Sequence, residues 1–160
     1  MQDLVAIATE IAAKLVERKQ TIAVAESSTG GLISAALLSV PGASGYFLGG
    51  AVVYTRDARR ILMDIPDDAM KGIRSASEPY AKLLANQIRT RFATDWGLSE
   101  TGGTGPTGNR YGDAAGHSCM AVAGAEITAI TLETGRNERL SNMHAFAATA
   151  LNLLLKELQR

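Results

Sequence analysis

The chain has little cysteine, few aromatic residues and no excess of charge of either sign. Its 160 residues include one cysteine, Cys119, and 5% aromatic residues. A single cysteine excludes an intramolecular disulfide and a zinc site built on several cysteines. Sixteen basic and sixteen acidic residues give a formal net charge of zero. This balance argues against a protein that coats nucleic acid, because such a protein carries a basic surface.

One stretch of the chain has no charge at all. Residues 27–55 contain no Asp, Glu, Lys or Arg, and an uncharged run of this length could span a bilayer. The same run holds six glycines and Pro41, a composition that favours helix, turn and strand in a protein core. The first twenty residues carry charges such as Asp3 and Glu10, so they lack the uncharged middle of a signal peptide. We expect a cytoplasmic protein without a membrane span, and the apolar run favours a homo-oligomer, most simply a dimer.

Hydrophobic periodicity predicts that helices and strands alternate along the chain. Helices are predicted at 3–19, 32–40, 57–63, 78–94 and 140–158, and strands at 21–25, 47–54, 118–123 and 126–133. Residues 100–116 are rich in glycine and have no periodicity, which predicts a loop. No repeat or linker divides the chain. We therefore predict one domain over residues 1–160, of the α/β class, with three α/β/α layers about a central, mostly parallel or mixed sheet.

The segment Glu26 to Gly31, which reads ESSTGG, lies between a predicted strand and a predicted helix. Ligands of open α/β sheets bind at the carboxyl ends of strands. Hydroxyls such as those of Ser27 and Thr29 could attack a substrate or hold a phosphate there. The N–H groups of Gly30 and Gly31, at a helix N-terminus, could receive an anion. The alternative is that Ser and Thr only cap the helix.

Two further segments are candidates for ligand contacts. Residues 101–108 read TGGTGPTG; they lack the lysine of a P-loop, but their glycines could let a ligand approach the backbone. The alternative is a plain flexible connection. Tyr54 and Arg59 could flank a reacting group or a phosphate, as could Arg136 and Arg139, and the alternative for both pairs is a solvated charge cluster.

The two histidines and the cysteine are the remaining candidates for metal ligands. His117 and Cys119 would share one face of a strand, and His144 lies in the last predicted helix. A closed structural zinc site needs four ligands and no fourth is apparent. We predict that the protein needs neither a metal nor another cofactor.

These motifs together resemble the C-terminal domain of the CinA family, which includes bacterial nicotinamide mononucleotide deamidases. ESSTGG at residues 26–31 resembles the family's Glu-Ser-Cys-Thr-Gly-Gly, and TGGTGP at residues 101–106 resembles its Thr-Gly-Ile-Ala-Gly-Pro. Weaker matches lie between and after them, in the same order and spacing, at residues 41–44, 53–59, 75–78 and 137–139. The resemblance covers nearly the whole chain.

The resemblance implies an amidohydrolase that converts nicotinamide mononucleotide and water to nicotinate mononucleotide and ammonia without a metal. It implies Ser27 as the nucleophile, with Tyr54 and Arg59 as the other catalytic positions. A small, nucleotide-like substrate would contact Thr29, Gly30, Gly31, Thr101, Gly102, Thr104, Gly105 and Arg139. We expect Ser27, Thr29, Tyr54, Arg59 and Thr104 to converge in one cleft at the carboxyl ends of the strands.

Departures from the family pattern bear on this assignment. Arg59 stands where the family has a lysine, residues 109–117 stand where its glycine-rich loop continues toward Lys-Pro-Val-Gly, and Met143 and His144 stand near a replaced arginine of the last helix. Ser28 in place of the family's cysteine is a mild change. A guanidinium stays protonated in proteins, so Arg59 cannot be a general base and the proton-transfer role is left unfilled. Two hypotheses therefore stay open: an amidohydrolase, or a catalytically altered or inactive homologue that binds a small nucleotide-like ligand.

Overall fold

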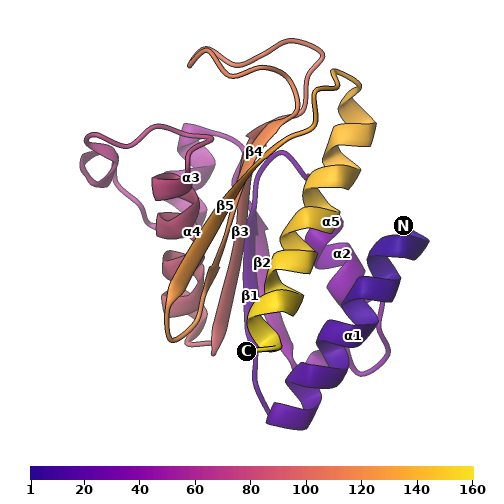
Figure 1. The fold of residues 1–160 in the computed structure, drawn as a ribbon. Coiled ribbons are helices and arrows are strands. Elements are labelled where there is room, and N and C mark those ends of the chain that lie inside the picture. Colours follow the sequence, from indigo (N-terminus) through magenta and orange to yellow (C-terminus); the bar gives the residue numbers. More distant parts are fainter.

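The computed structural model describes residues 1–160, and a five-stranded sheet lies between two layers of helices (Figure 1). The strands are β1 (Ile22–Glu26), β2 (Phe47–Val52), β3 (Trp96–Gly103), β4 (His117–Ala123) and β5 (Ile127–Glu133). Their order across the sheet is β2-β1-β3-β4-β5. β2, β1 and β3 run parallel, whereas β4 is antiparallel to both of its neighbours. The predicted α/β class and layered mixed sheet are confirmed.

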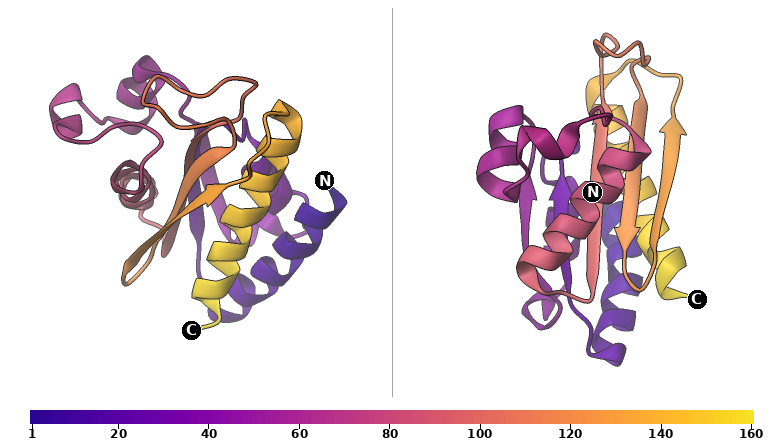
Figure 2. Two further views of the ribbon diagram at one scale, coloured as in Figure 1. Left: turned by 45° about the horizontal axis from the view of Figure 1, so that its top comes forward. Right: turned by 90° about the vertical axis from the view of Figure 1, so that its left-hand side faces the viewer.

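Helices cover both faces of the sheet (Figure 2). On one face lie α1 (Gln2–Arg18), α2 (Leu32–Leu38) and α5 (Arg139–Leu158), which contact one another. On the other face lies α4 (Glu78–Phe92), with α3 (Arg56–Met63) beside it. Two short 3-10 helices, Ala43–Gly45 and Asp67–Met70, complete the chain. All five predicted helices are present, with ends shifted by at most two residues.

The two faces of the sheet are packed differently. Large apolar side chains from α1, α2 and α5 meet Val24, Leu98 and Met120 of the sheet in one continuous core. On the other face, α4 contacts β4 mostly through alanines, with Cys119 among them, whereas Tyr80, Leu84 and Ile88 of α4 pack with Met63 of α3 over alanines of β1. A Cβ placed on Gly97 of β3 would lie 2.1 Å from the backbone oxygen of Ala85 in α4. Small residues therefore let α4 lie directly on the sheet.

The sequence predicted no strand where β3 begins, and the prediction of a loop over residues 100–116 is wrong for its first four residues. Glu100 pairs with Met120 and Gly103 pairs with His117, so this part continues β3 in an antiparallel ladder with β4. A Cβ on Gly102 would lie 2.5 Å from the side chain of Ser118, so glycine here serves close strand pairing. Only residues 104–116 form the loop, which stands above the edge of the sheet in Figure 1.

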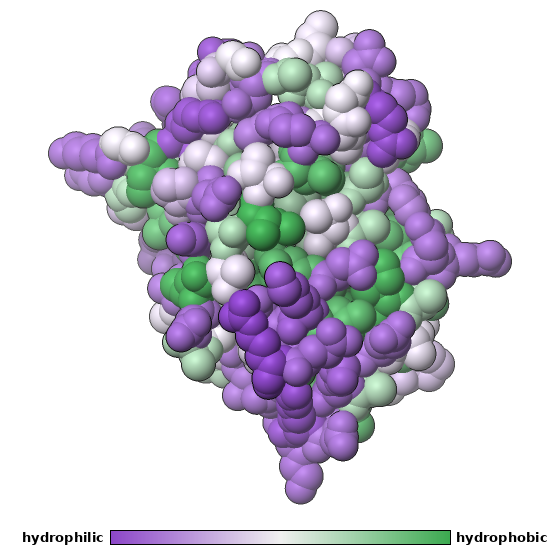
Figure 3. All heavy atoms as spheres, in the orientation of Figure 1, coloured by the Kyte–Doolittle hydropathy of each residue, from purple (hydrophilic) through white to green (hydrophobic).

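The uncharged run of residues 27–55 divides into a loop, α2, a 3-10 turn, β2 and the following connection. None of the helices combines the length and the apolar character that a membrane crossing requires. On the face shown in Figure 3, hydrophobic residues are interspersed with hydrophilic ones, and hydrophilic residues cover the bottom of the view.

The topology brings several loops to one edge of the sheet. The three parallel strands end there, so the connections at residues 27–31, 53–55 and 104–116 are neighbours. β4 begins at this edge and β5 ends at it, because each is antiparallel to the strand before it. Most of the candidate residues of the sequence lie on these connections, whereas Thr101 and Gly102 lie near the end of β3, Arg59 lies in α3 and Arg139 begins α5.

Candidate active site

The loop after β1 is held from one side by the carboxylate of Glu26. This carboxylate is fully buried and accepts hydrogen bonds from the N–H groups of Gly31 (2.9 Å), Ile33 (3.1 Å) and Ser34 (2.9 Å). It also accepts from the hydroxyls of Thr29 and Ser34, each at 2.7 Å. Glu26 thus satisfies the free N–H groups at the start of α2 and complements its positive end.

This contact overturns the expectation that Gly30 and Gly31 receive an anion. The N–H of Gly31 already donates to Glu26, and the N–H of Gly30 donates to the carbonyl of Ser27 at 3.1 Å. Gly31 has a φ of 108°, in the left-handed region that favours glycine. These two residues therefore shape the turn, and their N–H groups are not available to a substrate.

A second buried carboxylate, that of Glu100 on β3, holds the same loop from below. One oxygen, Oε2, accepts from the N–H groups of Ser27 (3.1 Å) and Thr29 (3.0 Å) and from the Thr29 hydroxyl (3.0 Å). The other oxygen, Oε1, accepts from the hydroxyls of Ser28 (2.5 Å) and Ser118 (3.0 Å). Burial raises the pKa of Glu100, although these hydrogen bonds act in the opposite direction.

The position of Thr29 corrects the predicted cleft. Its side chain is fully buried, and its hydroxyl lies between the carboxylates of Glu26 and Glu100. It does not line the cleft that the other candidates share. Thr29 therefore joins the two carboxylates below the loop.

A cleft of about 500 Å³ opens at the carboxyl ends of the parallel strands, a size that suits a small ligand. Five residues expected from the sequence line it, and these are Ser27, Tyr54, Arg59, Thr101 and Gly102. Three further arginines line it as well, at positions 56, 74 and 110, and no Asp, Glu or Lys does. Arg59 and Arg74 are paired with Asp67 and Asp113, so Arg56 and Arg110 supply the unpaired positive charge that suits the cleft to an anionic ligand.

A second lobe of about 260 Å³ adjoins this cleft and shares Tyr54, Gly102 and Asn109 with it. Its other lining residues are Ser28, Gly103, Thr104, Gly105, Thr107, Gly108 and Arg139. The Oγ1 atom of Thr104 is buried and has no hydrogen-bond partner within the protein. The convergence expected for Ser27, Tyr54 and Arg59 is confirmed, and Thr104 lies in the adjoining lobe.

Arg139, and not Arg59, holds the tyrosine of the site. The Tyr54 side chain is 59% exposed, and its hydroxyl accepts a hydrogen bond from Nη2 of Arg139 at 3.1 Å. The Nη1 group of Arg139 donates to the carbonyl of Gly105 at 2.6 Å. Arg139 thereby connects the start of α5 to both the tyrosine and the glycine-rich loop.

Arg59 is buried, and its charge is already paired within the protein. Its Nη2 group donates to the carboxylate of Asp67 at 2.7 Å, whereas its Nε group has no partner. Neither Lys71 nor Lys82 lines the cleft. No lysine therefore replaces the residue that the family pattern has at position 59.

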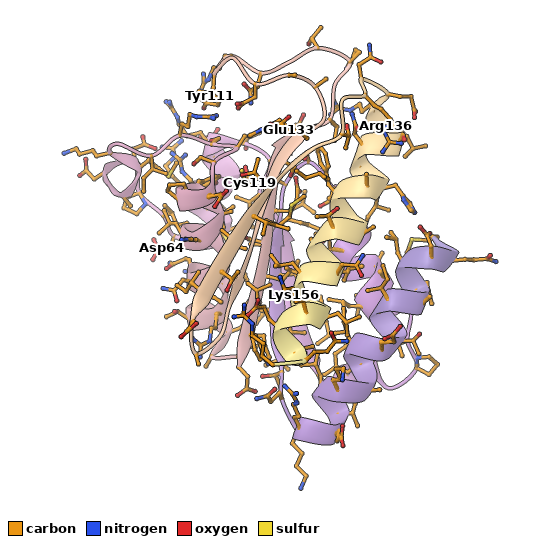
Figure 4. All side chains as sticks on the ribbon, viewed as in Figure 1. Asp64, Tyr111, Cys119, Glu133, Arg136 and Lys156 are labelled. Atoms are coloured by element: carbon orange, nitrogen blue, oxygen red, sulfur yellow. The ribbon has the colours of Figure 1, made fainter.

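Two arginines that sequence reasoning did not single out, Arg74 and Arg110, organise the part of the cleft wall that contains Tyr111. The loop of residues 27–31, the serine loop, contributes Ser27 to the same cleft. Both terminal nitrogens of Arg74 donate to the carboxylate of Asp113, at 2.6 and 3.1 Å, and this pairing holds the pKa of Asp113 below its usual value. The guanidinium groups of Arg74 and Arg110 lie 5.3 and 5.2 Å from the ring centre of Tyr111. Figure 4 shows Tyr111 on the loop of residues 104–116, on the side of α4.

His117 lies next to Asp113, the partner of Arg74 in this wall, with Nε2 3.6 Å from the Asp113 carboxylate. Its Nε2 atom lies 2.7 Å from the carbonyl of Ala76, and its Nδ1 atom contacts Glu133. Burial by itself lowers the pKa of His117, but Glu133, the Ala76 carbonyl and Asp113 outweigh burial and raise it.

The residues considered as metal ligands do not gather in one place. Cys119 shares the strand face of His117, with Sγ 3.9 Å from Nε2, and Figure 4 shows Cys119 and Glu133 on neighbouring strands. His144 contacts Asp3 on another part of the surface. No group of three or more His, Cys, Asp or Glu side chains is arranged to hold a metal ion.

In many small-molecule-binding and enzyme domains, a layered α/β fold holds its ligand in a cleft at the carboxyl ends of the parallel strands. This domain has the same arrangement, with polar loops around the cleft. The family profile described as the CinA C-terminal domain matches residues 4–158. The chain belongs to the CinA C-terminal domain family, as the motif resemblance predicts.

Relatives and solved structures agree with this assignment. A CinA-like protein of Gloeobacter violaceus is 36% identical over 154 residues, which cover 95% of this chain and 36% of the relative. A CinA-like protein of a Synechococcus strain is 41% identical over 110 residues, which cover 69% of this chain and 26% of the relative. The chain thus matches about a third of the length of these relatives or less.

Two crystal structures share the fold over nearly their whole length. The competence/damage inducible protein CihA from Agrobacterium tumefaciens has a TM-score of 0.90 and 26% identity, covering 99% of this chain and 96% of that one. A CinA superfamily protein from Klebsiella pneumoniae has a TM-score of 0.91 at 22% identity, covering 98% of both chains. This second likeness is one of fold alone.

Proposed function

We propose that the chain is an amidohydrolase that hydrolyses the carboxamide of nicotinamide mononucleotide to nicotinate mononucleotide and ammonia. The observation that carries the proposal is a cleft lined by Ser27 and four arginines, of which Arg56 and Arg110 are not paired with a carboxylate. Such a cleft pairs a nucleophile with groups that bind a phosphate. Membership of the CinA C-terminal domain family supports the same substrate class.

The reaction proposed here divides between a serine and its surroundings. A carboxamide is a poor electrophile, so a serine hydroxyl forms an acyl intermediate that water then hydrolyses. Ser27, the residue expected from the family pattern, lines the main cleft. Arg56 and Arg110 also line the cleft and are candidates to hold the phosphate, because no carboxylate is paired with either of them there. We propose that the reaction needs no metal or cofactor and takes place in the cytoplasm.

The test is release of ammonia from purified protein supplied with nicotinamide mononucleotide. Nicotinamide riboside, which lacks the phosphate, is the matched control substrate, and we expect it to react at least tenfold more slowly. Treatment with a chelator should leave the rate unchanged. If the protein releases no ammonia from the nucleotide, the amidohydrolase proposal is wrong.

A second candidate function is binding without turnover. It is favoured by Arg59, which stands at the family's lysine position and is paired with Asp67. In that case nicotinamide mononucleotide binds, as measured by calorimetry, while no ammonia appears. The two measurements together separate the two functions.

We also propose that a second copy of the chain pairs along β2. This strand lies at one end of the sheet and has a neighbour on one side only. Leu48 and Val52 on it are 46% and 43% exposed, and an uncharged apolar strand edge favours pairing with another chain. Sedimentation should show a dimer that Leu48→Lys converts to a monomer. A monomeric wild type would contradict this proposal.

A further inference from the structure

The structure leaves open which group accepts the proton of the attacking hydroxyl. Arg59 stays protonated and is paired with Asp67, and no lysine lines either lobe. Ser27 meets Glu100 only through its backbone N–H. The hydroxyl of Ser27 therefore has no base in contact with it.

The neighbouring serine has such a base. The hydroxyl of Ser28 donates to Oε1 of Glu100 at 2.5 Å. Ser28 is 5% exposed and lines the second lobe of the cleft, so a residue in contact with a buried carboxylate also borders the ligand-accessible space. In the same lobe the hydroxyl of Thr104 is 2% exposed and has no partner within the protein, which is an independent indication that a polar ligand belongs there.

The surroundings of Glu100 leave room for a proton on the oxygen that faces Ser28. Backbone N–H groups occupy only the other oxygen, Oε2. Oε1 meets two hydroxyls, and that of Ser118 lies 3.0 Å from Oε1 and 3.2 Å from the carbonyl of Thr101. When Oε1 carries a proton, Ser118 can accept a hydrogen bond from it and donate its own proton to Thr101.

We propose that Glu100 is the general base of this site and that the hydroxyl it activates is that of Ser28. The proposal rests on the amidohydrolase function and moves the nucleophile from Ser27 to Ser28. It also gives a reason for serine in place of the family's cysteine, because a carboxylate in contact with the hydroxyl assists a weak nucleophile.

The steps balance as follows for a carboxamide. Oγ of Ser28 attacks the carbonyl carbon, and its proton passes to Oε1 of Glu100. The carbon–nitrogen bond then breaks, Glu100 returns the proton to the departing nitrogen, and ammonia and an acyl ester on Ser28 result. Water attacks the ester with its proton passing to Glu100, the carbon–oxygen bond to Ser28 breaks, and Ser28 recovers a proton as the carboxylate product leaves.

The decisive variant is Glu100→Gln, because its shape and hydrogen bonds match the site. The amide oxygen can replace Oε2, and the amide NH₂ can donate to the hydroxyls of Ser28 and Ser118 in place of Oε1. The loop therefore keeps its geometry while the base is lost. We expect kcat for nicotinamide mononucleotide to fall by about 10²–10⁴-fold with little change in KM.

A pH profile separates this chemical role from a structural one. A general base must be deprotonated to act, so kcat of the wild type should fall as the pH is lowered through the pKa of Glu100. Glu100→Gln should lack this limb. Ser34→Ala is the matched control, because Ser34 donates to the other buried carboxylate and lies outside both lobes, so it should keep the wild-type rate.

A fluorophosphonate modifies activated serines whatever the natural substrate is. Labelling with this reagent therefore tests the proposal without the nucleotide. We expect mass spectrometry to find the label on Ser28, Ser28→Ala to abolish it, and Glu100→Gln to slow it about 100-fold or more. This result without ammonia release would leave the Glu100–Ser28 pair standing and refute the amidohydrolase function.

Three results would overturn the proposal. The first is a label on Ser27, or on neither serine. The second is Glu100→Gln with the wild-type kcat in a protein that does release ammonia. The third is Arg59→Lys raising kcat tenfold or more, because that gain would place the missing base at position 59.

Discussion

Glu26 ends β1, Glu100 lies within the neighbouring strand β3, and both are fully buried, yet their surroundings differ. Glu26 receives three backbone N–H groups and two hydroxyls, and both of its oxygens are bonded to N–H groups of α2 or the turn before it. Glu100 receives backbone N–H groups on one oxygen and hydroxyls only on the other. Each oxygen of Glu26 accepts from at least one fixed N–H group, so Glu26 acts as a helix cap. Glu100 has one oxygen that meets only hydroxyls, which can rotate, so this oxygen can exchange a proton.

The largest expected difference between the two carboxylates is in the stability of their glutamine variants. In Glu26→Gln the amide NH₂ must face N–H groups whichever way it turns, so buried donors lose their acceptor. We expect the free energy of unfolding to fall by about 3–5 kcal/mol. In Glu100→Gln the loss should stay within about 1 kcal/mol, because hydroxyls can reverse their direction. Urea unfolding measures the loss in both variants. Equal losses would show that the two carboxylates do not differ in this way.

A smaller effect is expected in the pH dependence of stability. Burial raises the pKa of Glu100, so the folded protein binds a proton that the unfolded chain releases at lower pH. The stabilisation that this proton gives the folded protein is complete below the pKa that Glu100 has in the unfolded chain. It is lost as the pH rises through the pKa that Glu100 has in the folded protein. Between the two values the unfolding free energy should fall by up to about 1.4 kcal/mol per pH unit relative to Glu100→Gln. A constant difference between the two proteins would mean that Glu100 stays ionised.

The smallest expected effect is that of Ser34→Ala. This change removes the Ser34 hydroxyl from Glu26, which keeps its three N–H donors and the Thr29 hydroxyl. We expect a loss of about 1 kcal/mol in unfolding free energy, measured by urea titration. A loss well above 2 kcal/mol would show that Glu26 depends on hydroxyls as Glu100 does.

Much of the fold follows from local patterns, because apolar residues at helical spacing and short apolar runs mark elements that pack on one core. β3 is the exception, because no strand was predicted over any of its residues. Residues 100–103 read as a loop because they are polar and rich in glycine, and only the pairing with β4 makes them a strand. Long-range pairing of this kind leaves no local signal.

The residues that line the cleft were predictable where a loop follows a strand, as for Ser27 and Tyr54, and in the first turns of the helix that comes next, as for Arg59. The site was not predictable where burial reverses the usual behaviour of a residue. A glutamate reads as a surface residue, so Glu100 gave no indication of its place below the serine loop. The cluster of hydroxyls at residues 27–29 is the one signal that could have suggested a buried carboxylate, since such a group needs donors.

The separation of Glu100 from its partners along the chain has a consequence for folding. The hydrogen bond from Ser28 to Glu100 joins residues 72 positions apart, and that from the Thr29 N–H joins residues 71 apart. Closing such long loops is slow, since chain entropy is lost before the contact forms. The serine loop therefore acquires its geometry only when β1 and β3 have paired. In native-state hydrogen exchange, the amide of Thr29 should open together with the centre of the sheet, although it lies in a loop.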